Sequence, residues 1–209
     1  MTTRRMAGAV LLLALGAGAP TPAADDGAEG RELRRFPEQY GGVWGVAFTP
    51  DGKRAVSGGG AFREGLPVAC VARLWDLDTG KELRRFQGHT RPVVGVAVSS
   101  DGKRLLTGSI DVTVSLWDID TGKELNRFMR HTNSVRCVAF APDGRSAVSG
   151  SDDRTARRWD LQTGRPLEVY VGAVGPVWSV AFAPDGKHVL TGSFDAGVRL
   201  YAEIGRAHV

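Results

Sequence analysis

The sequence of 209 residues predicts an all-β fold built from four repeated units of four short strands. The phrase LWDLDTGKELRRF, which starts at Leu74, returns in altered form at Leu116 and at Arg158, 42 residues later each time. An Asp-Gly pair follows an apolar stretch in every unit, and this is the strongest short-range hairpin signal. Between residues 31 and 201 no long segment has the apolar period of a helix.

The strands of one unit follow from its apolar and turn residues. A Val-x-x-Val-Ala-Phe stretch predicts the first strand, and the Asp-Gly hairpin leads to a second, such as Arg104–Gly108. The third strand ends at Trp117, and an Asp-Thr-Gly turn leads to a fourth, in which Leu125 and Phe128 are the apolar anchors. One unit cannot bury its apolar faces alone, so we expect neighbouring units to stack.

Two units depart from the regular pattern. The Asp-Gly spacings are 50, 42 and 42 residues, so the first unit is eight residues longer, and the insertion GGGAFREGLPVAC predicts a long loop after the second strand. The fourth unit stops at its third strand. At the other end, we expect an additional outer strand at Glu32–Phe36, ahead of the first complete unit.

These features resemble the WD-repeat β-propeller family, in its secreted bacterial type, over Arg31 to Tyr201. Three units end their third strand on Trp-Asp, whereas the fourth has Tyr201-Ala202; the three pairs are Trp75-Asp76, Trp117-Asp118 and Trp159-Asp160. The family's Gly-His pair is intact only at Gly88-His89. Its counterparts are Gln39, Arg130-His131 and Ala173. The resemblance implies propeller blades at about 32–78, 79–120, 121–162 and 163–202.

The resemblance also implies one buried hydrogen-bond network in each blade. In the second blade it would link Trp117, His89 and Asp111 with Thr107 or Ser109. In the third blade it would link Trp159, His131 and Asp153 with Ser149 or Ser151. The alternative is a hydrolase triad of His89, Ser109 and Asp111. The same set recurs 42 residues later, and an enzyme needs one such site, so we favour a structural network.

Motifs for metals, cofactors and catalysis are not complete in this sequence, and we predict none of the three functions. The alternating aspartates after Asp76 resemble a calcium loop, but the required glycine position is Lys81, and Gly80 comes one residue early. Gly58-Gly59-Gly60 lacks the Lys-Ser/Thr of a phosphate-binding loop. The four histidines have no metal-ligand spacing.

The N-terminus predicts export. Arg4 and Arg5 precede a short apolar run and small residues, which is typical of a signal peptide over residues 1–24. Cleavage is expected near Ala23 or Ala24, followed by a flexible lead-in at 25–31; the alternative is an uncleaved membrane anchor. We therefore expect a periplasmic, extracellular or cell-surface protein, without other membrane contact.

Charge and cysteines narrow the prediction further. The formal net charge is +4, but removing Arg4, Arg5 and Arg206 from the 27 basic residues leaves 24 against 23 acidic ones. A nearly neutral domain gives no reason to expect nucleic-acid binding. Cys70 and Cys137 fall in non-adjacent units, so we expect buried free thiols rather than a disulfide.

The last residues, 203–209, do not follow the repeat. The codons ATC GGA AGA GCA CAC GTC would encode Ile204–Val209, and this DNA resembles an adapter used in sequencing libraries. We therefore expect that the natural reading frame is interrupted near Ala202 and that further blades are missing; the alternative is a degenerate last turn. The four blades would then form an open arc or partial propeller with exposed apolar faces and poor solubility.

The sequence predicts a non-catalytic scaffold that binds a protein or peptide partner. The alternatives are a sensing or docking domain of a longer enzyme, and a glycan- or small-molecule-binding propeller. Strand directions place the insertion and the connections between blades at one end, where loops on a rigid scaffold can bind. The candidate contacts at this end are Trp44, Phe62, Arg63, Glu64, Arg91, Asn133, Arg136, Arg154 and Trp178, although Trp44 and Trp178 could equally be packing residues.

Overall fold

The computed structural model describes residues 31–37 and 41–202. Its contacts divide the chain into two units, Met1–Leu33 and Arg34–Val209, and the strands of the described residues all lie in the second. The expected signal peptide at 1–24, most of the lead-in, Gln39 and the tail at 203–209 lie outside the described residues. No helix in the described part of the chain is long and apolar enough to cross a membrane.

The fold is all-β, as predicted, and consists of antiparallel sheets that correspond to the repeated units. The first sheet contains β1 (Gly42–Phe48), β2 (Arg54–Arg63), β4 (Val71–Asp76) and β5 (Glu82–Gln87), and the short β3 (Leu66–Val68) pairs with β2. The second contains β6 (Val93–Val98), β7 (Arg104–Ser109), β8 (Val114–Asp118) and β9 (Glu124–Phe128).

The remaining two sheets repeat this order. The third contains β10 (Val135–Phe140), β11 (Ser146–Ser151), β12 (Ala156–Asp160) and β13 (Pro166–Tyr170). The fourth contains β14 (Val177–Phe182), β15 (His188–Ser193) and β16 (Val198–Ala202), and within the described residues it has no fourth strand.

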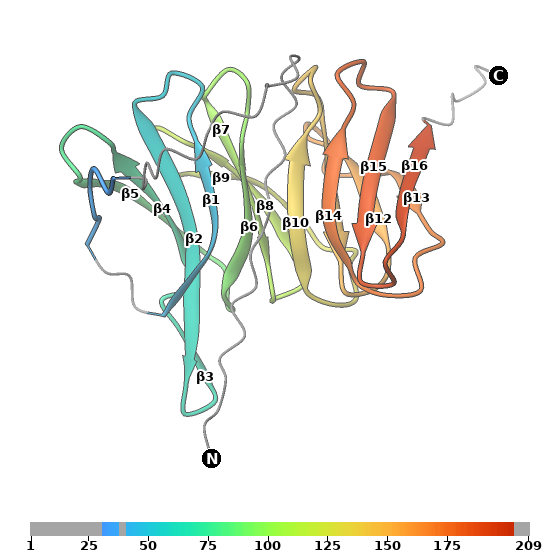
Figure 1. Ribbon diagram of the computed structural model, residues 1–209, viewed down its shortest axis with the longest axis horizontal. Helices are drawn as coiled ribbons and strands as arrows, with labels where there is room; N and C mark the ends of the chain where they lie inside the picture. Colours follow the sequence, from blue (N-terminus) through green and yellow to red (C-terminus); the bar gives the residue numbers. More distant parts are fainter. Residues whose placement is uncertain (1–30, 38–40, 203–209) are drawn as a thin grey trace, which may run out of the picture. The chain divides into compact units, whose positions relative to one another are not determined.

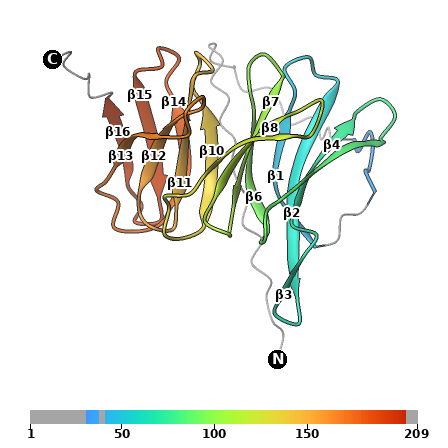
Figure 2. The same ribbon diagram turned by 180° about the vertical axis from the view of Figure 1, so that it is seen from behind.

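The sheets stand side by side in chain order, with their first strands adjacent (Figure 1). The first and the last sheet lie at opposite ends of this row when it is seen from either side (Figure 1 and Figure 2). Over residues 34–202, apart from 38–40, the row does not close into a ring. This agrees with the expected partial or open propeller.

The core lies between sheets rather than within any one of them. Phe86 of the first sheet packs into a buried cluster with Val93 and Trp117 of the second. Equivalent clusters join the second sheet to the third and the third to the fourth. Each sheet therefore buries its apolar side chains only against a neighbour, which is how repeat arrays gain stability.

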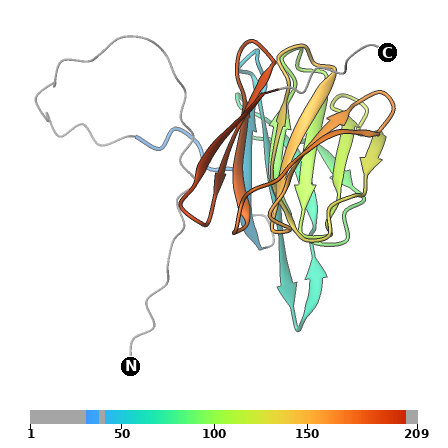
Figure 3. The same ribbon diagram turned by 90° about the vertical axis from the view of Figure 1, so that its right-hand side faces the viewer.

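The insertion in the first unit is not the predicted loop. It extends β2 and adds β3, and the resulting hairpin reaches beyond the neighbouring strands (Figure 1 and Figure 3). Glu64 and Gly65 form its two-residue turn, with φ of 52° and 81°. A turn with positive φ at both central residues matches the twist of a hairpin and suits glycine. The three consecutive glycines at the start of the insertion, Gly58–Gly60, precede this turn, and all three pair with β1.

The expected outer strand at Glu32–Phe36 is also not formed: residues 31–37 have no strand conformation. Phe36 nevertheless lies against Trp75, with ring centroids 5.5 Å apart. Arg34 donates a hydrogen bond to the carbonyl oxygen of Asp78 at 2.7 Å. The segment therefore keeps side-chain contacts of an outer strand without the backbone pairing of one.

Both cysteines are free thiols, as predicted, but each residue is half-buried rather than fully buried. Burial raises the pKa of the Cys70 thiol, and it raises that of the Cys137 thiol to about 12.

Candidate partner-binding face

All the sequence-predicted contact residues lie at the same end of the sheets, the lower end in Figure 1. This end carries the starts of the first strands and the ends of the second strands. It also carries the β2–β3 hairpin and the connections between sheets. We call it the partner-binding face.

A β-bulge near the start of each first strand shapes this face. The pairing register shifts between Val43 and Gly45 in β1, and again at the same place in β6, β10 and β14. The residue at the shift has no partner in the register, and such a bulge redirects its side chain. These four residues, which we call the bulge row, are Trp44, Val94, Arg136 and Trp178.

Each described partner of the bulge row belongs to the second strand of the same sheet or follows it directly. The Trp44 indole N–H donates to the carbonyl oxygen of Gly60 at 3.2 Å. Arg136 forms an ion pair with Asp152, with an Nε–Oδ1 distance of 2.9 Å. Both indoles remain more than half exposed, and Arg136 is exposed as well.

Trp178 has an aromatic partner. Its ring lies 4.9 Å from that of Phe194, centroid to centroid, with the planes tilted by 53°. Phe194 is two-thirds exposed, so the pair forms an apolar patch on the surface. Aromatic side chains held in this way present area with little loss of entropy, which is what binding anchors require.

The β2–β3 hairpin forms the side of the face nearest the first sheet. Phe62 lies under the Arg91 guanidinium, 5.9 Å from ring centroid to Cζ, so the hairpin contacts the connection between the first two sheets. Arg63 and Glu64 are exposed at its tip, followed by exposed Leu66. The hairpin thus adds both apolar and charged side chains to this side of the partner-binding face.

Buried polar side chains fix the connections that carry Arg91 and Asn133. Ser109 Oγ donates to the carbonyl oxygen of Arg91 at 2.9 Å, and Asp111 accepts from the N–H of Thr90. Ser151 Oγ donates to the carbonyl oxygen of Asn133 at 3.0 Å in the same way. The backbone beneath these two contact residues is therefore held rigidly. Arg154 is exposed in a neighbouring turn with φ of 69°.

The second sheet contains a continuous chain of polar contacts. The Trp117 indole N–H donates to Thr107 Oγ1 at 2.8 Å, and Thr107 Oγ1 lies 2.7 Å from His89 Nε2. His89 Nδ1 lies 2.9 Å from Asp111 Oδ2. An ionised Asp111 can only accept, so His89 Nδ1 donates to it, and in the neutral imidazole Nε2 is then the acceptor for the Thr107 hydroxyl. Thr107, not Ser109, occupies the central position.

The third sheet repeats the chain with serine in place of threonine. Ser149 Oγ accepts from Trp159 Nε1 and lies 2.8 Å from His131 Nε2, while His131 Nδ1 lies 2.7 Å from Asp153. Ser151 is outside this chain, like Ser109 in the second sheet. A nucleophile bonded to a tryptophan within a buried core does not face a substrate. The geometry therefore supports a structural role for both sets.

Electrostatics favour the ionised form of the aspartate in the hydrogen-bond networks of both the second and the third sheet. Burial alone would raise the pKa of Asp111, but hydrogen bonds from His89 and Thr113 outweigh it and lower the pKa well below the ordinary value. The pKa of Asp153 is lowered similarly, by hydrogen bonds from His131 and Thr155 that outweigh its burial. Each carboxylate also accepts a backbone N–H of the connection, from Thr90 or Thr132.

The fourth sheet keeps Asp195 with a different partner. Ala173 provides no imidazole, and Arg199 of β16 donates to Asp195 instead, at 2.8 Å from Nη2 to Oδ2. Hydrogen bonds from Arg199 and Ser193 lower the pKa of Asp195 strongly. Asp195 still accepts the N–H of Val174 at 2.7 Å. The connection is therefore fixed here too, by a half-exposed network.

The first sheet has the corresponding tryptophan contact, in which the Trp75 indole N–H donates to Ser57 Oγ at 2.8 Å.

Sequence reasoning missed several residues of the face. Phe194 and Asp152 hold the positions that follow the second strand, in register with Ile110, and a comparison of the repeats against the bulge row could have identified them. Exposed Met129 and Val174, in the connections between sheets, gave no comparable signal.

Among the described residues there is no group of three or more His, Cys, Asp or Glu that could hold a metal ion.

Comparison with known families identifies the repeats. A family model described as "WD domain, G-beta repeat" matches residues 30–76, 80–118, 122–160 and 164–202. These four segments together make up well over half of the chain, and each ends at the last residue of the third strand of a sheet. The comparison with curated proteins found no match.

Proposed function

This chain belongs to the WD-repeat family, and on that premise we propose that it is a non-catalytic scaffold that binds a protein or peptide through the partner-binding face. Repeats of this family generally mediate protein interactions. Function resides in the site and not in the fold, so the proposal depends on what this face displays.

The observation that carries the proposal is the bulge row. The bulge row has exposed Trp44 on the first sheet, Arg136 on the third sheet and exposed Trp178 on the fourth. Tryptophan and arginine are the residues most enriched among those that dominate binding energy. The network under the connections keeps the neighbouring contact residues in place, so this face would lose little conformational entropy when a partner binds.

The chemistry of the face favours an extended partner that carries apolar side chains and a carboxylate. Trp178 and Phe194 offer an apolar patch. Exposed Arg91 and Arg154 lie on the connection and the turn of neighbouring sheets, where they could pair with acidic groups. We propose in addition that residues 1–24 export the protein, so that the partner is met outside the cytoplasm.

A displayed random-peptide library tests this function even though the partner is unidentified. Peptides enriched on the protein should contain aromatic or aliphatic residues together with Asp or Glu. Their binding should weaken in Trp44→Ala and Trp178→Ala variants. Lys187→Ala and Lys103→Ala are the matched controls, because both lysines are exposed in hairpins at the opposite end of the sheets.

Peptides that bind equally well to the tryptophan variants would overturn the proposed face. Peptides that lose affinity in the lysine variants would place binding at the opposite end.

A further inference from the structure

Each buried cluster between sheets joins two different faces. The earlier sheet contributes its rear face, which in the first sheet includes Val56, Ala72 and Leu74. The later sheet contributes its front face, which in the second sheet includes Val93, Leu105 and Trp117. All six of these side chains are at most 2% exposed. The same pairing recurs at the other two junctions.

The fourth sheet has a rear face with nothing against it in the described chain. In the repeat, Leu190, Val198 and Leu200 correspond to Val56, Ala72 and Leu74 of the first sheet. They are 44%, 73% and 66% exposed, whereas their counterparts are buried. The backbone agrees, because a Cβ on Gly58 would meet the next sheet at about 3 Å, whereas one on the equivalent Gly192 would meet only Ser179.

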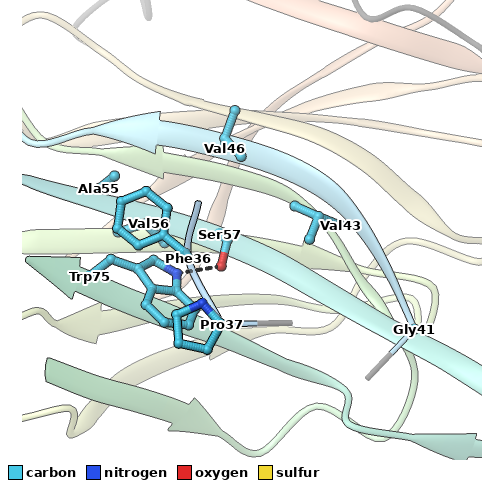
Figure 4. Close-up of a pocket in the computed structure, with 9 residues that line it drawn as sticks. All are labelled: Phe36, Pro37, Gly41, Val43, Val46, Ala55, Val56, Ser57 and Trp75. Atoms are coloured by element: carbon cyan, nitrogen blue, oxygen red, sulfur yellow. Dashed lines mark hydrogen bonds between the residues drawn. The ribbon is translucent and has the colours of Figure 1, made fainter. Parts of the chain in front are cut away.

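The first sheet has the matching front face. Val43 and Val46 correspond to Val93 and Val96, yet they are 50% and 65% exposed. Together with Ala55 and Trp75 they line an open cavity of about 500 Å³ (Figure 4). In the second and third sheets, the rear side chains of the preceding sheet fill this space.

Part of a preceding sheet is already in place beside that cavity. Phe36 lies 5.5 Å from Trp75, which repeats the contact of Phe86 with Trp117 at 5.9 Å. Arg34 donates to the carbonyl of Asp78, much as Arg84 donates to the carbonyl of Thr121. Residues 34–36 therefore occupy the place of an outer strand that has no sheet of its own. The fourth sheet, conversely, has β16 as an unpaired edge.

We propose that the rear face of the fourth sheet docks onto the front face of the first sheet in a second copy of this chain. Leu190, Val198 and Leu200 of one copy would fill the cavity beside Trp75 of the other. Residues 34–36 of the second copy would pair with β16 as its missing fourth strand. This contact continues the junction that the chain already forms three times.

The repeat fixes the register of the new pair. Val114 lies opposite Phe128 and Leu116 opposite Asn126 in the second sheet. The same register places Phe36 opposite Val198 and Arg34 opposite Leu200 across the two copies, with Arg35 opposite Arg199. Because the two docking surfaces differ, the contact is head to tail. Each copy has one rear face and one front face, so each copy can take part in two such contacts.

Two charge substitutions test the docking. Leu200→Glu spoils the rear face and Val46→Glu spoils the front face, so each variant alone should sediment as a monomer at concentrations where the wild-type chain self-associates. Mixed together, the two variants should form a 1:1 complex, because one intact rear face and one intact front face remain. Leu125→Glu, on the exposed side of β9, is the control and should associate like the wild type.

A cysteine pair distinguishes docking between copies from closure within one chain. Arg35→Cys and Arg199→Cys, in a background with Cys70→Ser and Cys137→Ala, should form a disulfide on oxidation because cross-strand Cβ atoms lie about 5 Å apart. The proposal expects covalently linked chains of twice the single-chain mass or more. A cross-linked single chain would show closure within one copy and would overturn it. A wild-type chain that remains monomeric, or variants that do not combine, would overturn it as well.

Discussion

Trp178, at the start of β14, packs against Phe194, which directly follows β15, with ring centroids 4.9 Å apart; Arg136 and Asp152 hold the same two positions in the third sheet. One pair is aromatic and the other ionic, although both are built on the same bulge. The scaffold thus repeats while the surface chemistry changes from blade to blade. A binding face is expected to vary in this way.

Replacing Phe194 with alanine should expose Trp178 to water. The Phe194 ring packs against the indole and shields part of it, so Phe194→Ala should shift the fluorescence of this tryptophan to longer wavelength. The measurement is the emission difference between Phe194→Ala and wild type in a background with Trp44→Phe, which removes the other exposed indole. Since the pair lies on the surface, thermal stability should change little. An unshifted emission would contradict the contact between the two rings.

Thr107, at the centre of the buried hydrogen-bond network of the second sheet, should be essential for stability. Thr107→Val keeps the shape but removes the partner of both Trp117 and His89. Two buried polar groups are then left unpaired, and the free energy of unfolding should fall by about 2 kcal/mol. Urea denaturation measures this loss. Thr107→Ser, which restores the hydroxyl group found in the third sheet, should recover most of it.

Acid should weaken the networks. The pKa of Asp111 in the folded chain lies below its ordinary value of 3.8, so its stabilising contribution is complete above about pH 4 and is lost as the pH falls towards the folded-state pKa. Asp111→Asn does not titrate, and its stability should therefore fall less than that of wild type between about pH 5 and about pH 2.5. Urea midpoints across this range test the sign. Parallel curves would show that the carboxylate is not linked to folding.

Val112 should be a site where substitution stabilises the protein. Its φ is 68°, a conformation in which a β-branched residue is strained and asparagine is tolerated. Arg154 and Ala196 adopt the same conformation in the equivalent turns. Val112→Asn should raise the free energy of unfolding by about 1 kcal/mol, as measured by thermal or urea unfolding. A lower stability would show that the Val112 side chain contributes packing that outweighs the strain.

The thiols should react slowly until the chain unfolds. Burial raises the pKa of the Cys137 thiol to about 12, so little thiolate is present at about pH 8. A chromogenic disulfide reagent should label it far more slowly in buffer than in urea. Cys70, whose pKa is also raised by burial, should react slowly as well, and the Cys137→Ala variant isolates its rate.

The repeat in the sequence was sufficient to predict the strands and the stacking of units, because period, turns and apolar positions agree. It could not choose between Thr107 and Ser109, since alternate residues of a strand face the same side. Only the structure shows which of the two reaches Trp117.

The surface was less predictable for a related reason. A bulge adds one residue to a pairing, and pairing is invisible in a single sequence. Trp44 and Trp178 were therefore identified without the feature that directs them outward. The insertion in the first unit was expected to be a loop because its eight extra residues have no counterpart in the other units, whereas Glu64 and Gly65 form a hairpin turn. The outer strand at Glu32–Phe36 requires a sheet edge beside it, whereas the unpaired edge of the described chain, β16, belongs to the fourth sheet at the other end of the row.

The measurement that tests the central claim most directly is the affinity of one library-selected peptide for Trp178→Ala and for Lys187→Ala. Both residues belong to the fourth sheet, at opposite ends. If the bulge row is the binding site, the dissociation constant should rise about 30-fold or more in Trp178→Ala, as expected for a residue that dominates binding. It should remain unchanged in Lys187→Ala. Equal affinities in the two variants would contradict the account.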